Sequence, residues 1–228
     1  PLASVAVHVT VVFPIGKIPP VGALLVNVML FGAVQLSATA GAVKTIVAVQ
    51  LAPALAVIVA GAVIKSIAAK IEEGFALPPI EEFEKLITPK TKGIMICNPN
   101  NPTGYLYTQQ EMNAIRDLVK KYDLYLFSDE AYREFRYDGR EFISPMHLSG
   151  FEENVIVLDT VSKRYSACGA RIGLMISKNT EVMSTALKFA QARLSPPSLG
   201  QILGEASLDT PSEYFDEVIS EYVQRRNL

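Results

Sequence analysis

Short apolar runs that alternate with amphipathic stretches, from Ile71 to the end of the chain, constrain the fold more than any other feature of this sequence. Apolar runs at Gly93–Cys97, Leu124–Phe127 and Asn154–Leu158 each stop at polar residues, and Gly173–Ile176 adds a further run. Such runs are typical of buried strands, and strands that alternate with helices form parallel sheets covered on both faces. The sequence therefore predicts an α/β fold with three α/β/α layers around a mostly parallel sheet.

Helices are expected between these strands. Pro79–Ile87 indicates a short one. Thr108, with Glu111 three residues later, has the capping-box pattern, which predicts a helix of about four turns. Its apolar face is expected to hold Met112, Ile115, Leu118, Val119 and Tyr122.

Two more helices are expected near the end of the sequence. Thr180 is expected to cap one that runs to about Arg193. The segment from Thr210 to Glu213 combines a capping-box pattern with a proline at the first helical position, and so predicts the start of another. The apolar face of this last helix is expected to hold Tyr214, Phe215, Val218, Ile219, Tyr222 and Val223.

The composition excludes several classes of function. Of the 228 residues 50% are hydrophobic, and the net charge is −2 with 21 Lys and Arg, so no basic stripe for nucleic acid is expected. Two cysteines, Cys97 and Cys168, form no disulfide framework and suit a reducing compartment, so we expect a cytoplasmic protein. His8 and His147 are isolated, without the spacing of metal ligands, so we expect no metal site.

The first 70 residues differ from the rest. All 23 acidic residues lie at or after Glu72, and the uncharged stretches on either side of Lys44 are about as long as a membrane span. Their prolines, polar amides and many β-branched residues favour buried strands instead, so we expect no membrane insertion. We treat residues 1–70 as an apolar, atypical N-terminal part. Because the chain begins with Pro1 and has no signal-peptide pattern, we expect that its start is a cut.

Polar residues follow three of the predicted strands. Asn101 lies in NPNNPTG, Asp129 in SDEAYREF and Lys163 in DTVSKRYSACGARIG. In open α/β sheets, ligands bind outside the carboxyl ends of the strands. If neighbouring strands carry these residues, an amide, a carboxylate and an amine meet in one crevice.

Pyridoxal phosphate needs such a set of groups. A lysine in a dry pocket forms an imine with an aldehyde, and a carboxylate keeps a ring nitrogen protonated so that the ring withdraws electrons. Lys163 and Asp129 are the candidates for these two tasks. Asn101 and the Tyr132 hydroxyl are candidate donors to the phenolic oxygen. The cofactor phosphate needs a cation and hydroxyl donors, for which Arg171 and Thr160 are suited.

The blocks NPNNPTG, SDEAY and SKRYSACGARIG, in this order and at these intervals, resemble the signature blocks of the class I/II aminotransferases. These are fold-type I pyridoxal-phosphate enzymes of the aspartate aminotransferase group. The resemblance covers residues 71–228. It implies that Lys163 forms the Schiff base, that Asp129 pairs with the pyridine nitrogen, and that Asn101 and Tyr132 pair with the phenolic oxygen. It also implies that Arg171 and Thr160 bind the phosphate.

The resemblance implies amino-group transfer between an amino acid and a 2-oxo acid by a cytoplasmic homodimer. It places the whole chain, residues 1–228, in the large cofactor-binding domain, and we expect the C-terminal small domain to be absent. Two alternatives stay open. The chain could be a catalytically incomplete fragment with a binding role or no independent function, or a pyridoxal-phosphate-dependent lyase or synthase that shares the same blocks.

The sequence departs from the family pattern in the first 70 residues. The resemblance makes residues 21–31 the counterpart of the turn that cups the phosphate, but they lack its glycine-serine pattern. The aromatic residue that stacks on the cofactor ring is also missing, and Ala52 or a neighbour would take its place.

Overall fold

The computed structural model describes residues 13–14, 58–59, 62–63, 65–193 and 196–228. Our expectations for residues 21–31 and for Ala52 lie outside the described residues, as does most of the segment in which we weighed a membrane span. In the part of the chain that is described, no helix combines the length and the apolar character needed to cross a membrane.

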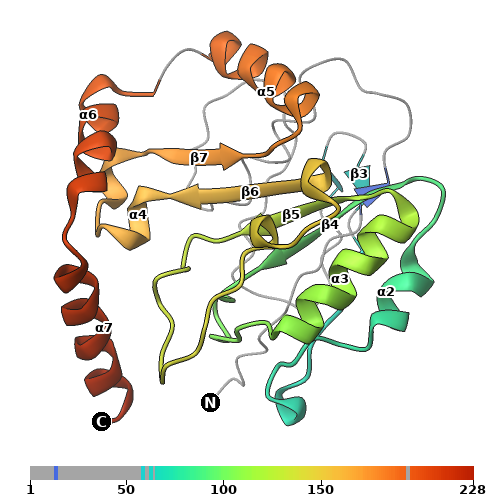
Figure 1. The fold of residues 1–228 in the computed structure, drawn as a ribbon, viewed down its shortest axis with the longest axis horizontal. Coiled ribbons are helices and arrows are strands. Elements are labelled where there is room, and N and C mark those ends of the chain that lie inside the picture. The colour runs from blue at the N-terminus through green and yellow to red at the C-terminus, as the bar shows by residue number, and fades with distance from the viewer. Residues whose placement is uncertain (1–12, 15–57, 60–61, 64, 194–195) are drawn as a thin grey trace.

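A five-stranded sheet forms the centre of the described structure, with strand order β1-β4-β5-β6-β7 (Figure 1). β4, β5 and β6 are parallel to one another, whereas β1 and β7 are antiparallel at the two edges. Its strands are β1 (Phe13–Pro14), β4 (Thr91–Cys97), β5 (Tyr125–Asp129), β6 (Val155–Thr160) and β7 (Gly173–Ile176), and β2 (Ile58–Val59) pairs with β3 (Ala62–Val63) in a separate hairpin. The predicted α/β class, with parallel strands at its centre, is confirmed.

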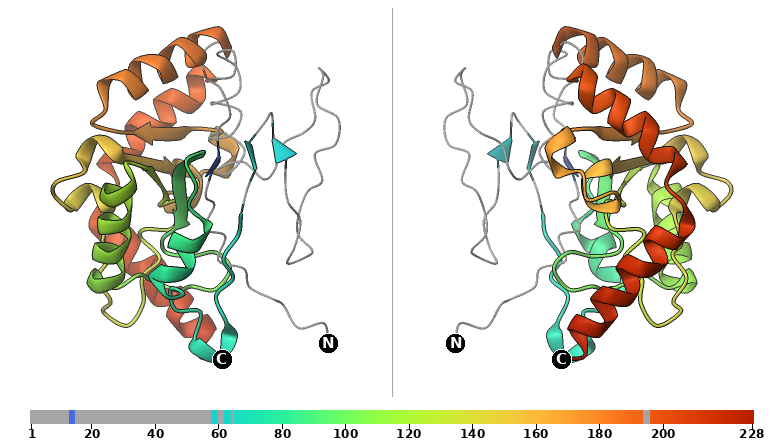
Figure 2. Two further views of the ribbon diagram at one scale, coloured as in Figure 1. Left: turned by 90° about the vertical axis from the view of Figure 1, so that its right-hand side faces the viewer. Right: turned by 90° about the vertical axis from the view of Figure 1, so that its left-hand side faces the viewer.

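Helices lie on both faces of this sheet and beyond one of its ends (Figure 1). They are α2 (Ile80–Leu86), α3 (Gln109–Tyr122), α4 (Val161–Arg164), α5 (Thr180–Arg193), α6 (Ser198–Ala206) and α7 (Ser212–Arg226). α2 and α3 pack on one face, and Val182 of α5 packs against the other. α6 and α7 lie beyond the end of the sheet toward which β6 points (Figures 1 and 2).

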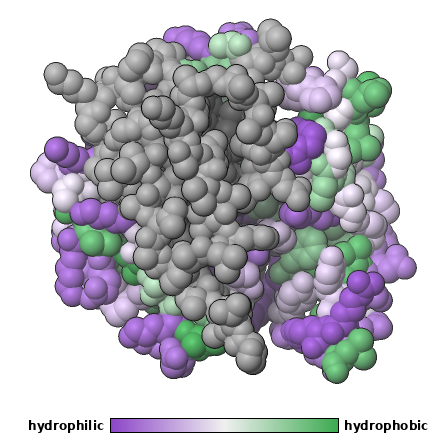
Figure 3. Space-filling model, turned by 180° about the vertical axis from the view of Figure 1, so that it is seen from behind, coloured by the Kyte–Doolittle hydropathy of each residue, from purple (hydrophilic) through white to green (hydrophobic). Residues whose placement is uncertain are grey.

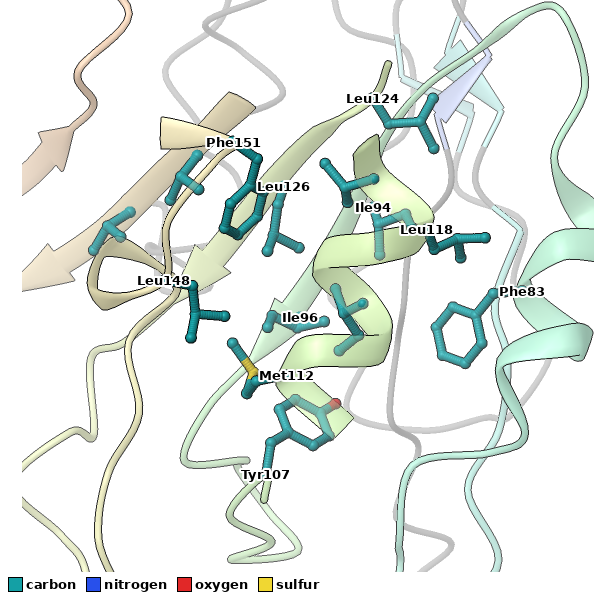
Figure 4. Packing of buried hydrophobic residues seen from close by; sticks show 14 of the residues in the cluster. Phe83, Ile94, Ile96, Tyr107, Met112, Leu118, Leu124, Leu126, Leu148 and Phe151 are labelled. Atoms are coloured by element: carbon teal, nitrogen blue, oxygen red, sulfur yellow. The ribbon is translucent and has the colours of Figure 1, made fainter. Parts of the chain in front are cut away.

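Alternation along the strands divides the core between the two faces. Ile94 and Ile96 of β4 point toward α3, whereas Met95 between them points toward the face of α5. The larger cluster joins the three parallel strands to α2 and α3 (Figure 4); its fully buried members include Phe83, Ile94, Met112, Ile115, Val119, Leu126 and Val155. Each such side chain contributes about 1.5–3 kcal/mol when it leaves water, so this cluster is what fixes α3 against the sheet.

The capping box of α3 forms as the sequence predicts. Thr108 Oγ1 accepts a hydrogen bond from the Glu111 backbone N–H at 3.2 Å, and Glu111 Oε2 accepts one from the Thr108 N–H at 2.7 Å. Glu111 Oε1 also accepts from the Tyr105 hydroxyl at 2.8 Å and from the Leu77 N–H at 3.0 Å. One carboxylate therefore caps the start of the helix and holds two neighbouring segments against it.

The prediction that Tyr122 lies on the buried face of α3 is wrong. Its side chain is 36% exposed, and its hydroxyl donates to a carboxylate oxygen of Glu84. Tyr122 is the last residue of the helix, so its ring lies at the rim of the cluster and its hydroxyl reaches Glu84 of α2.

The cap of α5 is also displaced from its predicted position. Thr180 is the first helical residue, and Asn179 before it is the N-cap: its Oδ1 accepts a hydrogen bond from the Val182 N–H at 3.0 Å. Asparagine is as good a capping residue as threonine, and the helix begins one residue earlier than it would if Thr180 were its cap.

α7 begins without the predicted capping box between Thr210 and Glu213. Pro211 occupies the N-cap position, and no side chain caps the helix. Its predicted apolar face is only partly covered, by ring contacts such as Phe135 with Tyr222 and Tyr165 with Phe215. Figure 3 shows exposed apolar side chains among polar ones along the edge that carries α6 and α7; on α6 they are Leu199, Ile202 and Leu203.

Two threonines at helix starts give a matched test of these caps. Thr108→Ala is expected to lower the free energy of unfolding by about 1 kcal/mol, because α3 loses its N-cap acceptor. Thr210→Ala is expected to change it by less than about 0.5 kcal/mol, because Thr210 caps no helix. Urea unfolding of both variants measures the two values. Equal losses in the two variants would contradict the assignment.

Candidate active site

The parallel pairing of three strands brings their carboxyl ends to one edge of the sheet. Cys97 at the end of β4 pairs with Asp129 at the end of β5, and Asp129 pairs with Leu158 of β6. β6 continues to Thr160 and then enters the short helix α4, at the end of the sheet where α6 and α7 lie (Figure 1). The segments that follow the three strands are therefore neighbours in space, as the sequence predicts for ligand-binding residues.

Asn101 and Tyr132 meet above this edge. The Asn101 side-chain amide Nδ2 donates a hydrogen bond to the Tyr132 hydroxyl oxygen at 3.0 Å, across 31 residues of sequence. The turn that carries Asn101 is held by the buried Asn98, whose Nδ2 donates to the Ile143 carbonyl at 3.1 Å and whose Oδ1 accepts from the Tyr107 N–H at 3.1 Å. The position of the exposed Asn101 thus follows from a neighbour that is fully buried.

Lys163 reaches the same place from β6. Thr160 caps α4 by accepting a hydrogen bond from the Ser162 N–H at 3.1 Å, and Lys163 follows on this single turn of helix. Its Nζ lies 5.9 Å from the centroid of the Tyr132 ring, within the range of a cation–π contact. The structure therefore brings together Asn101, Tyr132 and Lys163, which come from three separate sequence blocks.

Asp129 lies on the last position of β5 and is largely shielded from solvent. Its Oδ1 accepts a hydrogen bond from the Ala131 N–H at 3.1 Å. Burial, and to a smaller degree the neighbouring Asp159 carboxylate, raise the pKa of Asp129 above its ordinary value, against the effect of the Ala131 N–H. Burial and the Asp129 charge together raise the pKa of the adjacent Cys97 thiol to about 12, so that thiol stays protonated at neutral pH.

Thr160 and Arg171 lie where the chain turns from β6 to β7, but their side chains contact different groups. Thr160 Oγ1 donates to the Ile172 carbonyl at 2.9 Å, and the same hydroxyl lies 2.8 Å from Ser162 Oγ. Arg171 is exposed, and its Nη1 donates to the Cys168 carbonyl at 3.2 Å. Thr160 pairs across the sheet with Gly173, so the two candidates for phosphate binding stand on adjoining strand ends.

Glu130 was not among the residues that the sequence singled out. Its side chain is 1% exposed, and its Oε1 accepts hydrogen bonds from Ser128 Oγ at 3.1 Å and from Ser144 Oγ at 2.7 Å. Burial raises the pKa of this carboxyl to about 7, although both serines and the more distant Arg133 act to lower it. The sequence places a glutamate beside Asp129, but it does not reveal that long-range packing encloses it.

The buried ion pair of Asp159 and Arg164 was also missed. Asp159 precedes Thr160 and Arg164 follows Lys163, so the pair brackets the segment that carries the lysine. The signal in the sequence is the charge pair itself, five residues apart. Only the packing of the strand ends shows that both side chains are buried.

Comparison with known proteins gives a consistent result. A family model described as aminotransferase class I and II matches residues 55–227. An aspartate aminotransferase from Bacillus subtilis is 31% identical over 157 residues, which cover 68% of this chain and 40% of that protein. An aromatic-amino-acid aminotransferase from Thermococcus litoralis is 33% identical over 176 residues, which cover 76% of this chain and 45% of that protein.

Solved structures are similar over the same region. The structure of an alanine aminotransferase from Pyrococcus furiosus superposes with a TM-score of 0.64 at 35% sequence identity, over 70% of this chain and 41% of that one. The chain thus spans about two fifths of the length of the relatives it matches.

The buried Glu130 predicts a pH dependence of stability with a definite sign. Between its ordinary pKa of 4.5 and about 7, the folded chain holds a proton on Glu130 that the unfolded chain has already lost. The free energy of unfolding contributed by this group is therefore present at low pH and falls as the pH rises through that window.

Glu130→Gln removes this titration and keeps an oxygen that accepts from both serines. The free energy of unfolding of the variant minus that of the unmodified chain is expected to increase by about 2–3 kcal/mol as the pH rises from about 5 to about 8. Urea unfolding at several pH values measures the difference, with the exposed Glu72→Gln as control. A difference that stays constant with pH would refute the prediction.

Proposed function

The chain belongs to the class I and II aminotransferases, and on this premise we propose that it binds pyridoxal phosphate and serves amino-group transfer between an amino acid and a 2-oxo acid. Because the chain spans about two fifths of its relatives' length, activity, substrates and partners are all part of the proposal. The relatives are named for aspartate and for aromatic amino acids, so we propose the reaction type and leave the substrate side chain open.

One observation carries this proposal. Asn101, Tyr132 and Lys163 follow three different strands, yet the amide is 3.0 Å from the tyrosine hydroxyl and the amine is 5.9 Å from the tyrosine ring centroid. An exposed amine beside an aromatic ring and a hydrogen-bonded hydroxyl is the donor set that a ring aldehyde with a phenolic oxygen requires.

Asp129 fits the ring nitrogen of such a cofactor. Among the described residues, the structure records a backbone N–H as its hydrogen-bond donor and gives it no cation as partner. A shielded carboxylate with a raised pKa gains a favourable partner in a protonated pyridine nitrogen. The cofactor, when bound, supplies an aromatic ring that withdraws electrons from the substrate's α-carbon.

Tyr132 and Asn101 would hold the phenolic oxygen. Because the Asn101 amide donates to the Tyr132 oxygen, the tyrosine keeps its own proton for donation to an oxyanion. Thr160 and Arg171, on adjoining strand ends, would bind the phosphate through a hydroxyl and a guanidinium.

Lys163 would have two tasks. Its Nζ would hold the cofactor before substrate arrives, and the freed amine would then take a proton from the substrate's α-carbon and pass it to the cofactor carbon that is bonded to the transferred nitrogen. The Tyr132 ring, next to this amine, limits where it moves. A lyase or synthase of the same fold would use these residues in the same way, so product analysis with an amino acid and 2-oxoglutarate distinguishes the two.

The remaining expectations are proposals of the same kind. We propose a cytoplasmic homodimer, on the family resemblance and the scarcity of cysteine. A chain that binds the cofactor without turnover is the second candidate, because of the short span of the match to its relatives. A single pair of assays, cofactor attachment and turnover, separates it from a working enzyme.

Cofactor attachment tests the role of Lys163. We expect the chain, incubated with pyridoxal phosphate and reduced with borohydride, to carry the pyridoxyl group on the peptide that contains Lys163. Lys163→Arg is expected to lose this label, because a guanidinium does not form the linkage. Peptide mass spectrometry measures the label, with the exposed Lys90 as internal reference. Equal labelling of both lysines would sink the assignment.

The charge of Asp129 is tested separately. Asp129→Asn keeps the size of the side chain and an oxygen for the Ala131 N–H, but loses the charge. The affinity for pyridoxal phosphate is expected to fall about 10–100-fold, since a hydrogen bond to a charged group contributes about 1.5–3 kcal/mol. Fluorescence or absorbance titration measures the dissociation constant, with the exposed Asp117→Asn as matched control. An unchanged constant in Asp129→Asn would rule out this role.

A further inference from the structure

We propose that Arg164 is a positioning residue, which fixes Lys163 relative to Tyr132 through a cluster of four charges, two of which are buried. We call Arg133, Glu134, Asp159 and Arg164 the ion cluster. The inference rests on the proposed function in one respect: the position of Lys163 matters because its amine reacts.

The inner half of the ion cluster is the pair of Arg164 and Asp159. Arg164 Nη2 donates to Asp159 Oδ2 at 2.5 Å, and the two side chains are only 9% and 2% exposed. Asp159 Oδ1 also accepts from the Thr160 N–H at 2.7 Å. One carboxylate therefore binds both the residue that caps α4 and the residue that ends it.

The outer half comes from the segment after β5. Glu134 Oε1 lies 3.4 Å from Arg164 Nε and 3.5 Å from Arg133 Nε, and Arg133 Nη1 lies 3.6 Å from Asp159 Oδ2. The four charges alternate in sign, so every contact among these pairs is attractive. The ion cluster thus joins the end of β6 to the segment that follows β5.

The ion cluster lies next to both Lys163 and Tyr132 in the sequence. Arg164 follows Lys163 directly, and Arg133 follows Tyr132 directly. Arg164 is buried while Lys163 is exposed, so the two adjacent side chains leave α4 on different sides. α4 has four residues, too few to hold a helix by its own hydrogen bonds. Its placement therefore depends on contacts outside the helix, among them those of Arg164 with Asp159 and Glu134 and the burial of Val161.

Stability alone does not account for this arrangement. A buried ion pair is often no more stabilising than apolar residues of the same volume, because both charges lose water. What a guanidinium adds is geometry: Nη2 donates a hydrogen bond to Asp159, while the buried Nε, which has no hydrogen-bond partner among the described residues, lies 3.4 Å from Glu134 Oε1 as an ion pair. A lysine has one nitrogen and holds only one of these carboxylates closely. The several nitrogens of the guanidinium are therefore needed to link α4 to the segment that follows β5.

Two substitutions break the link and keep most of the fold. Arg164→Lys keeps a cation beside the buried Asp159 but loses the guanidinium. Glu134→Gln breaks the link from the other side, at a residue that is 28% exposed. Arg226→Lys is the matched control: Arg226 binds Asp138 through two nitrogens at 2.8 and 2.9 Å, far along the chain from Lys163.

The main measurement is trace acetylation of the native chain with acetic anhydride, which needs no cofactor. Fragment ions assign the acetyl group to position 163, so that a label on the side chain introduced at position 164 is not counted, and the labelling is compared with that of the exposed Lys90 and Lys188. In Arg164→Lys and in Glu134→Gln, Lys163 labelling is expected to rise about threefold, because the amine is released from the Tyr132 ring. If both residues act in one link, the double variant is no different from either single one.

A second measurement follows the rate at which pyridoxal phosphate becomes borohydride-trapped on Lys163. We expect about a tenfold loss in both variants and none in Arg226→Lys, since a displaced amine reacts slowly. Failure of the unmodified chain to trap the cofactor would refute the proposed function, while acetylation still decides the present inference.

Unchanged Lys163 acetylation in both variants would overturn the inference. An equal rise for Lys90, Lys188 and Lys163 would overturn it as well, because it would mean general loosening of the fold.

Discussion

The parallel pairing of β4, β5 and β6 is the constraint on which the rest of this structure depends. It holds Cys97, Asp129 and Leu158 side by side, and so it fixes where the three following segments start. The cluster under α3 keeps the strands in register, since a shift by one residue would turn Ile94, Ile96 and their partners toward the opposite face. Core packing on one face of the sheet therefore sets the strand register, and the register places the site residues at the carboxyl ends of the strands.

Charges at this end fall into two groups with different surroundings. Glu130, Asp159 and Arg164 are buried and have partners within the chain, which suits groups that hold segments together. Lys163 and the uncharged Asn101 are exposed. Asp129 is largely buried and accepts a hydrogen bond from a backbone N–H, so these three side chains are suited to bind a ligand. Burial raises the pKa of both Asp129 and Glu130, but the two serine hydroxyls, of Ser128 and Ser144, donate hydrogen bonds only to Glu130. Neighbouring carboxylates therefore serve different purposes.

Local patterns predicted much of this fold, and long-range packing decided the rest. The apolar runs placed β4, β5, β6 and β7 to within about two residues, and the capping box placed α3, because both signals lie in adjacent residues. The cap of α5 was misplaced by one residue, since Asn179 and Thr180 are both good caps. The burial of Glu130 and Arg164 could not be predicted, because it depends on segments more than ten residues away. The residues of the candidate site were found from their positions after the strands, while the groups that brace them were not.

The most direct test of the central claim is a crystal structure of the chain grown with pyridoxal phosphate. We expect continuous electron density from Lys163 Nζ into the cofactor, with the ring nitrogen about 2.8 Å from the Asp129 carboxylate. A cofactor bound elsewhere, or Lys163 and Asp129 facing separate cavities, would contradict the account.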